Sequence, residues 1–166
     1  MGSFIIEGGH RLQGEVIPQG AKNEALQILC AVMLTAEPVT IHNLPDIVDV
    51  NKLIHLLGDL GVKTQHIGPG SWRFEADDVH LEHLQTEAFR TKGSALRGSV
   101  MILGPMLGRF GVGAIPRPGG DKIGRRRLDT HFIGFQKLGA TFSYDASTGF
   151  FNASAEGGLK GVHMLL

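Results

Sequence analysis

Several kinds of residue are scarce in this sequence, and each shortage excludes a class of protein. Only one of the 166 residues, Cys30, is a cysteine, so the chain cannot hold a disulfide framework. With one tryptophan and one tyrosine besides nine mostly core-like phenylalanines, it is short of the stacking residues that bind single-stranded nucleic acid. Sixteen acidic residues balance sixteen basic ones, so no overall field attracts nucleic acid or an anionic membrane.

Long apolar runs are also missing. The longest apolar stretches, around residues 28–34 and 100–107, are far shorter than the roughly 20 residues that span a bilayer. The N-terminus lacks the basic region and apolar run of a secretory signal. We therefore expect a cytoplasmic protein without a membrane partner. Because Cys30 lies within an apolar stretch, we interpret it as a buried structural thiol rather than a reactive one.

Motifs for metals and nucleotide cofactors are absent as well. Among the eight histidines only His80 and His83 lie close together, and no zinc-binding spacing occurs. Neither a dinucleotide-binding glycine motif nor a P-loop is present. The sequence thus predicts no metal site and no cofactor.

Two segments of the chain have the same predicted order of elements. The first has a helix at 23–35, a strand at 39–42, a helix at 48–60, and strands at 63–67 and 72–76. The second has a helix at 94–107, a strand at 112–115, a helix at 128–138, and strands at 141–144 and 150–153. Gly61 and Gly139 end equivalent helices, because glycine accepts the conformation that a helix C-terminus favours. We interpret this as an internal repeat whose copies pack together.

The second copy has four additional residues, since the offset between matching positions grows from 74 to 78 along the chain. They fall in the segment 118–127, which has one proline, three glycines, one carboxylate and four cations. These charged residues are Asp121, Lys122, Arg125, Arg126 and Arg127. Guanidinium groups bind phosphate through two parallel hydrogen bonds, so a small phosphorylated ligand is expected. A solvated basic loop is the alternative, and zero net charge weighs against a third reading, nucleic acid.

Two further positions offer cations near helix starts. Lys22 and Asn23 lie at the start of a predicted helix, where free backbone N–H groups and the helix dipole favour an anion. An ordinary loop with a solvated lysine is the alternative. Arg97 lies near the start of an apolar helix, where a cation opposes the dipole. It could bind a ligand or be paired at the surface.

Taken together, these segments resemble a known enzyme family, UDP-N-acetylglucosamine 1-carboxyvinyltransferase. The resemblance spans nearly the whole chain, with the motifs in the same order and at matching spacing. The motifs are Gly20-Ala21-Lys22-Asn23, Ser94-Ala95-Leu96-Arg97, Leu103-Gly104-Pro105, Arg109-Phe110-Gly111, Pro118-Gly119-Gly120, Ile123-Gly124-Arg125-Arg126, Asp129-x-His131 and Gln136-Lys137-Leu138-Gly139-Ala140.

The resemblance implies an α/β fold, the inside-out α/β barrel of the enolpyruvyl transferases, with three βαβαββ repeats in each of two domains. Residues 1–19 would then be a strand segment of the other domain, 20–90 the first repeat, and 91–166 the second repeat with the catalytic loop 118–127. We therefore expect an N-terminal fragment that lacks the general base of the family. Such a fragment should be inactive by itself.

The resemblance also implies an activity. Members transfer the enolpyruvyl group of phosphoenolpyruvate to the 3′-hydroxyl of UDP-N-acetylglucosamine, releasing phosphate, in the first committed step of peptidoglycan synthesis. The full-length protein would be monomeric or weakly associating. Positions matching phosphoenolpyruvate contacts are Lys22, Asn23 and Arg126. Positions matching UDP-N-acetylglucosamine contacts are Arg97, Arg126, Arg127, Leu128, Asp129 and Thr130.

Asp121 matches the loop residue that acts as proton donor, where most members have cysteine. A carboxyl group is ordinarily ionised at neutral pH and nearby cations favour that form, so it could donate a proton only if loop closure removes water. Otherwise Asp121 would serve substrate placement or product release. Fosfomycin acts in this family by alkylating the loop cysteine, so the sequence predicts resistance. A second departure is Arg127, where many members have proline.

Two alternatives to this function stay open at the level of sequence. The first is 5-enolpyruvylshikimate 3-phosphate synthase of the same fold, which typically has Lys-Ser where this chain has Lys22-Asn23. The second is a non-catalytic module that binds a phosphorylated ligand or RNA through the basic loop.

Overall fold

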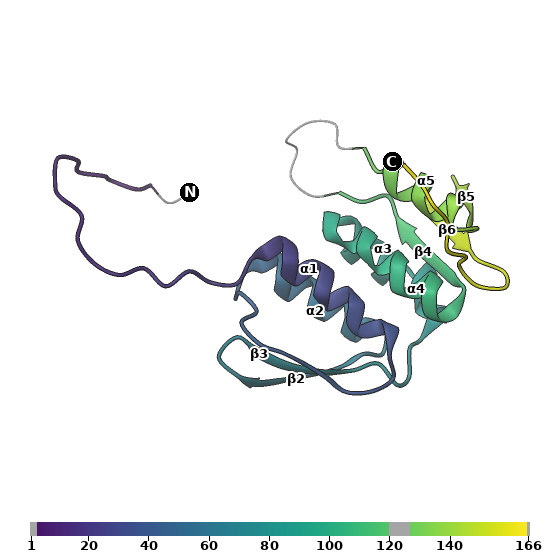
Figure 1. Ribbon diagram of the computed structural model, residues 1–166, viewed down its shortest axis with the longest axis horizontal. Helices are drawn as coiled ribbons and strands as arrows, with labels where there is room; N and C mark the ends of the chain where they lie inside the picture. The colour runs from purple at the N-terminus through teal and green to yellow at the C-terminus, as the bar shows by residue number, and fades with distance from the viewer. Residues whose placement is uncertain (1–2, 120–126, 166) are drawn as a thin grey trace.

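The computed structural model describes residues 3–119 and 127–165, which form two units of similar construction (Figure 1). The first unit comprises α1 (Lys22–Ala31), the 3-10 helix η1 (Val32–Leu34), β1 (Val39–Ile41), α2 (Val48–Asp59), β2 (Lys63–Gly68) and β3 (Ser71–Glu75). The second comprises η3 (Arg97–Ile102), α4 (Leu103–Phe110), β4 (Val112–Pro116), α5 (Asp129–Lys137), β5 (Thr141–Asp145) and β6 (Phe150–Ser154). Both units follow the element order expected from the sequence.

Each unit has a three-stranded antiparallel sheet in which the last strand lies in the middle. The strand orders are β1-β3-β2 and β4-β6-β5. Val39 of β1 lies opposite Phe74 of β3, and the second unit pairs Ile115 of β4 with Phe151 of β6. The equal topology confirms that the two copies of the sequence pattern fold alike.

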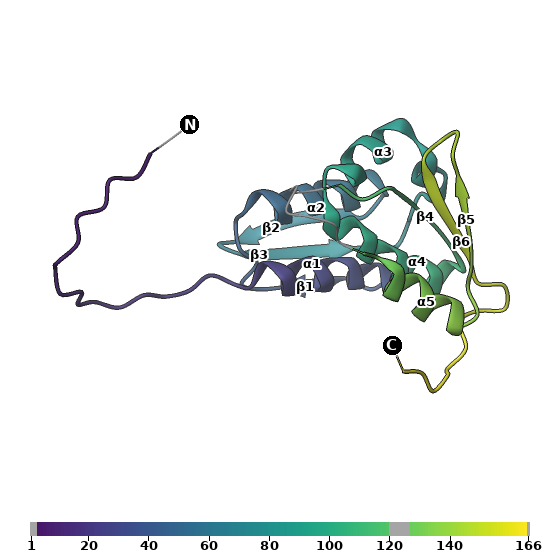
Figure 2. The ribbon, with the colours of Figure 1, turned by 90° about the horizontal axis from the view of Figure 1, so that it is seen from above.

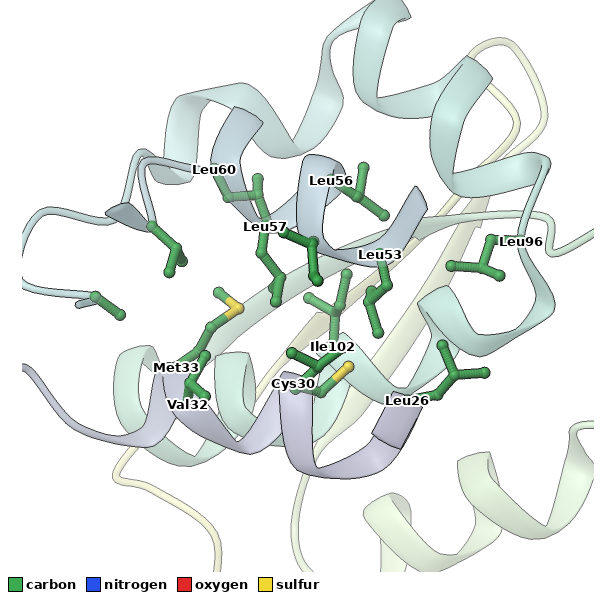
Figure 3. Close-up of a cluster of buried hydrophobic side chains, with 14 of the residues drawn as sticks. Leu26, Cys30, Val32, Met33, Leu53, Leu56, Leu57, Leu60, Leu96 and Ile102 are labelled. Carbon is green, nitrogen blue, oxygen red and sulfur yellow. The ribbon is translucent and has the colours of Figure 1, made fainter. Parts of the chain in front are cut away.

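A large apolar core joins the two units. Figure 3 shows Leu26 and Cys30 of α1 facing Leu53 and Leu57 of α2, with Ile102 of the second unit between them. Cys30 is 2% exposed, and burial raises the pKa of its thiol to about 12. The thiol therefore stays protonated at neutral pH, and the burial predicted for Cys30 is confirmed.

The predicted helix at 94–107 differs from the observed structure. The chain bends after Ser94, forms η3, and continues as α4 from Leu103. Pro105 explains the division, because it has no N–H group and its ring would clash with the carbonyl of Met101 in a continuous α-helix. Arg97 consequently begins a 3-10 helix, in place of the α-helical first turn expected for it.

Two elements between the units were not predicted, η2 (Leu81–Gln85) and α3 (Glu87–Ser94). The hydroxyl of Thr86 accepts a hydrogen bond from the Phe89 backbone N–H at 3.2 Å, which caps the start of α3. Helix α3 packs against both β4 and α2. The expected boundary between residues 90 and 91 falls within this helix.

Residues 3–19 form an extended arm that leads away from the body (Figures 1 and 2). All of them are exposed, and they form no helix or strand. A β-strand needs a neighbouring strand for its backbone hydrogen bonds, and residues 3–19 pair with none in the described chain. The assignment of residues 1–19 to another domain therefore stays a prediction. Elsewhere in the described chain, no helix is long and apolar enough to span a bilayer.

Candidate functional site

A pocket of about 640 Å³ lies where α1, α2, η3 and the start of α5 meet. It brings together four residues that the sequence analysis assigned to substrate binding, and these come from both units. They are Lys22, Asn23, Arg97 and Leu128. The other lining residues are Leu26, Gln27, Asp49, Lys52, Ala95, Leu96, Gly98, Val100, Met101 and His131.

Lys22 and Asn23 open α1 at one side of this pocket. Ala21 precedes them in an extended conformation and provides no side-chain cap, so the first N–H groups of α1 stay available to an anion. The ammonium of Lys22 lies 2.9 Å from the carboxylate of Asp49 in the first turn of α2. This pair is half exposed and contributes at most about 1 kcal/mol. Lys22 can therefore exchange Asp49 for an anionic ligand at little cost.

Arg97 borders the pocket from the second unit. Its Nη2 atom donates a hydrogen bond to the backbone carbonyl of Arg127 at 3.3 Å, which ties η3 to the segment before α5. Arg127 in turn donates from Nε to a carboxylate oxygen of Asp129 at 2.7 Å, and its Nη2 contacts the same oxygen. The guanidinium of Arg127 is thereby directed to Asp129.

The charges that line the pocket favour an anionic ligand. Lys22, Lys52 and Arg97 are cationic, whereas Asp49 is the one carboxylate among the described lining residues. Two of these cations come from the first unit and one from the second. Such a site suits a ligand with more than one negative group.

The sequence profile of EPSP synthase (3-phosphoshikimate 1-carboxyvinyltransferase) matches residues 6–166 of this chain. The chain belongs to the EPSP synthase family. Similar proteins named UDP-N-acetylglucosamine 1-carboxyvinyltransferase occur in Bacteroides fragilis, with 59% identity, and in Porphyromonas gingivalis, with 51%. Each match covers all of this chain and 38% of the relative. The chain thus spans about two fifths of the length of these relatives.

Solved structures show that the fold is the one expected. The enolpyruvyl transferase NikO from Streptomyces tendae matches 90% of this chain and 31% of its own, with a TM-score of 0.67 and 23% identity. EPSP synthase from Acinetobacter baumannii matches 90% of this chain and 33% of its own, with a TM-score of 0.59 and 15% identity. At these identities the likeness concerns the fold alone. It confirms the α/β fold of the enolpyruvyl transferases for this member of the EPSP synthase family.

Not every predicted site residue of this EPSP synthase family chain lies in the pocket. Arg127, Asp129 and Thr130 lie on the adjoining segment, and none of them is among the described lining residues. Asp121 and Arg126 lie outside the described residues, as do Lys122 and Arg125.

The described residues on either side of 120–126 both approach the pocket. Leu128 lines it. At Gly119 the chain passes so close to α3 that an added Cβ would lie 2.0 Å from the carbonyl oxygen of Ser94. Ser94 directly precedes Ala95, which is a lining residue. The ends of the glycine-rich segment therefore adjoin the site.

Sequence reasoning missed four polar residues of the pocket, namely Gln27, Asp49, Lys52 and His131. Asp49 and Lys52 are three positions apart on α2 and so share a face, but only the packing of α2 beside α1 brings that face to the pocket. His131 belongs to a motif recognised in the sequence, yet it was not assigned a role in binding. It lies two residues after Asp129 and lines the pocket from α5.

Proposed function

We propose that the whole protein is a UDP-N-acetylglucosamine 1-carboxyvinyltransferase. It would transfer the enolpyruvyl group of phosphoenolpyruvate to the 3′-hydroxyl of UDP-N-acetylglucosamine in the cytoplasm, in the first committed step of peptidoglycan synthesis. The observation that carries this proposal is the pocket in which Lys22 and Asn23 of one unit face Arg97 of the other. The relatives of this name, with 51–59% identity over the whole chain, support it further.

The reaction explains why two sets of cations are needed. In the addition step the sugar 3′-hydroxyl loses its proton to a base and its oxygen bonds to C2 of phosphoenolpyruvate, while the electrons of the C2–C3 π bond take up a proton at C3. In the elimination step C3 loses a proton, the bond from C2 to the phosphate oxygen breaks, and phosphate leaves. Cations that hold the phosphate and carboxylate lower the barrier by positioning the reactants and balancing their charge.

We assign roles to residues on this basis. Lys22 and Asn23 at the start of α1 hold phosphoenolpyruvate, together with Arg126. Arg97 and the segment from Arg126 to Thr130 hold the UDP-sugar, whose diphosphate provides the anionic groups that such cations bind. Asp121 is the proposed proton donor. It works as an acid only where water is excluded, because an exposed carboxyl group is ionised at neutral pH.

Phosphate release by the whole protein tests the proposal. With phosphoenolpyruvate present, we expect release with UDP-N-acetylglucosamine as acceptor and none with shikimate 3-phosphate. Arg97→Ala should lower kcat/KM about 100-fold, mainly through the KM of the UDP-sugar, since a charge-assisted contact is lost. Arg73→Ala, at an exposed arginine on β3, should leave both constants unchanged.

Other results would point to the alternatives. Faster phosphate release with shikimate 3-phosphate would identify an EPSP synthase. If neither acceptor reacts and a short RNA binds with an affinity that collapses at high salt, the protein is a binding module. Sedimentation of the whole protein should show a monomer or a weakly associating species.

Fosfomycin tests the role of Asp121 separately. A carboxylate is a far weaker nucleophile than a thiolate, so the whole protein should show no time-dependent inactivation by the epoxide. Asp121→Cys should become sensitive and carry the adduct on the new thiol. A covalent adduct on Asp121 in the unmodified protein would contradict the assignment.

A further inference from the structure

Three side chains with metal-binding groups gather between the two units, away from the pocket. His80, Glu82 and His83 each offer one ligand atom, and these atoms lie within 4.8 Å of one another. The Nδ1 atom of His80 is 3.2 Å from the Oε1 atom of Glu82. The two imidazole rings stack, with their centroids 5.0 Å apart and their planes inclined by 18°.

The tautomer of His83 is determined by its hydrogen bond. Its Nδ1 atom lies 2.8 Å from the backbone carbonyl oxygen of Asp59 at the end of α2. A carbonyl oxygen only accepts, so Nδ1 carries the proton and Nε2 keeps a free lone pair. Histidines that bind metals are commonly oriented in this way, with the second ring nitrogen donating to a carbonyl.

Backbone hydrogen bonds hold the ligand-bearing segment in place. The His80 N–H donates to the carbonyl of Leu60 at 2.8 Å, and the His83 N–H donates to the carbonyl of His80 at 3.1 Å. The hydroxyl of Thr86 donates to the carbonyl of His83 at 2.9 Å. Because these bonds anchor the main chain at both histidines, little ordering is required when an ion binds.

The carboxyl group of Glu82 is suited to bind a cation. Its side chain is mostly exposed, and its Oε1 atom lies beside the Nδ1 atom of His80. An ion can therefore approach this oxygen from the solvent.

We propose that His80, Glu82 and His83 form a binding site for a divalent ion of the zinc type. The ligands would be Nδ1 of His80, Oε1 of Glu82 and Nε2 of His83, with water in a fourth position. Bonds of about 2.0–2.1 Å in a tetrahedron separate neighbouring ligands by about 3.3 Å, and His80 and Glu82 already have this spacing. Binding replaces their hydrogen bond, in which Nδ1 of His80 is the donor, and the proton of the neutral His80 ring moves from Nδ1 to Nε2.

The site is separate from the candidate active site. Asp49 lines the pocket near the start of α2, whereas Asp59 contacts His83 at its end. Ten residues of α-helix separate these positions by about 15 Å. A bound ion would fasten the segment 80–83 to the end of α2, so we expect it to stabilise the fold without taking part in enolpyruvyl transfer. The sequence alone predicted no metal site, because the spacing of His80, Glu82 and His83 matches no zinc-binding motif.

Calorimetric titration of zinc into the untagged, metal-free protein tests this site. We expect one ion per chain with micromolar or tighter affinity, and a rise in Tm with zinc concentration. His83→Ala and Glu82→Gln should each weaken binding about tenfold or more and abolish the rise in Tm. His55→Ala, at an exposed histidine on α2 outside the cluster, should bind zinc like the unmodified protein.

The use of two variants separates a loss of zinc binding from a failure to fold. Glu82 is 70% exposed, so Glu82→Gln is expected to fold even if His83→Ala does not, and circular dichroism checks both. The proposal fails if the unmodified protein binds no zinc, or if Glu82→Gln binds zinc as tightly as the unmodified protein does.

Discussion

Arg109 joins the two units through a single guanidinium nitrogen. Its Nη1 atom donates to the backbone carbonyls of Met33 and Thr35, both at 3.0 Å, and to that of Ala76 at 2.8 Å. The first two carbonyls lie at the end of η1, where a helix leaves acceptors unpaired. The guanidinium also lies 4.8 Å from the centre of the Phe110 ring. One side chain of the second unit therefore satisfies three acceptors of the first.

We expect Arg109→Ala to lower the free energy of unfolding by about 3 kcal/mol, because three partly buried carbonyls lose a charged donor. Urea denaturation measures this. Arg73→Ala on β3 should change the value by no more than about 0.5 kcal/mol. Equal effects of the two substitutions would show that the Arg109 contacts do not stabilise the fold.

Gly61 and Gly139 provide a matched pair, since each follows the second helix of its unit with a positive φ, +92° and +96°. An added Cβ at Gly61 would lie 2.3 Å from the carbonyl oxygen of Asp78 and 2.3 Å from the His80 ring, whereas at Gly139 it would meet nothing within 4 Å. Gly139→Ala should cost about 1 kcal/mol from backbone strain. Gly61→Ala should cost at least about 2 kcal/mol more, and equal losses in thermal unfolding would refute the difference.

Candidate site residues could be predicted where the neighbouring sequence indicates their role. Lys22 and Asn23 stand at a helix start and Arg97 lies in a recognisable motif, so sequence alone suggested an anion site. Asp49 and Lys52 carry no such local signal. They look like an ordinary polar face of a helix until the packing of α2 beside α1 brings them to the pocket.

Among the described elements, the hairpin of β5 and β6 has a stability that should depend on acid. Asp145 accepts hydrogen bonds from the Ser147 hydroxyl at 2.6 Å, the Thr148 hydroxyl at 2.7 Å and the Ser147 backbone N–H at 2.9 Å. These bonds, the Ser147 hydroxyl first, lower the pKa of Asp145 from 3.8 to about 2. A lowered pKa stabilises the fold above the unfolded value and loses that effect as pH falls toward 2.

Carboxyl NMR titration measures this directly. Asp145 should titrate near pH 2, and Ser147→Ala should raise its pKa toward the ordinary value, since the largest cause of the shift is removed. In urea denaturation, the stability difference between the unmodified protein and Asp145→Asn should be constant above pH 5 and shrink between pH 4 and 2. Titration of Asp145 near 3.8 in the unmodified protein would contradict the turn geometry.

The order of elements could be predicted because the helices predicted at 48–60 and 128–138 have clear apolar periodicity and are each followed by a glycine, Gly61 and Gly139. Helix α3 was missed because it buries only Phe89 and Gly93, which is too little for a recognisable apolar face. The central place of β3 and β6 in their sheets also has no local signal. It depends on which strand edges the helices leave accessible, and that is a property of the packed molecule.

On the scale of the whole molecule, the arm of residues 3–19 is separate from the folded body. Its apolar side chains are 85–95% exposed, namely Phe4, Ile5, Ile6, Leu12, Val16 and Ile17. Deleting residues 1–19 should therefore change the free energy of unfolding by no more than about 0.5 kcal/mol. It should also reduce self-association of the chain in sedimentation experiments, because exposed apolar surface is removed.

A loss of more than about 2 kcal/mol on this deletion would show that the arm packs against the body in solution. A deletion of residues 156–165 is not a suitable control, since the backbone N–H of Lys160 donates to the Leu138 carbonyl at 2.8 Å. Substituting serine for the six apolar residues of the arm is the better match. It keeps the length of the chain and should reproduce the effect on association.

The shared core has a consequence for how the chain could be divided. Ile102, Met106 and Phe150 of the second unit belong to the same buried cluster as Leu29 and Leu53 of the first. Separate halves, cut between residues 76 and 77, would each expose part of this cluster to water. Neither half should fold alone, whereas mixing the two should restore helical circular dichroism through fragment complementation. The repeat unit is thus a unit of sequence and topology, while the pair of units is the unit of cooperative folding.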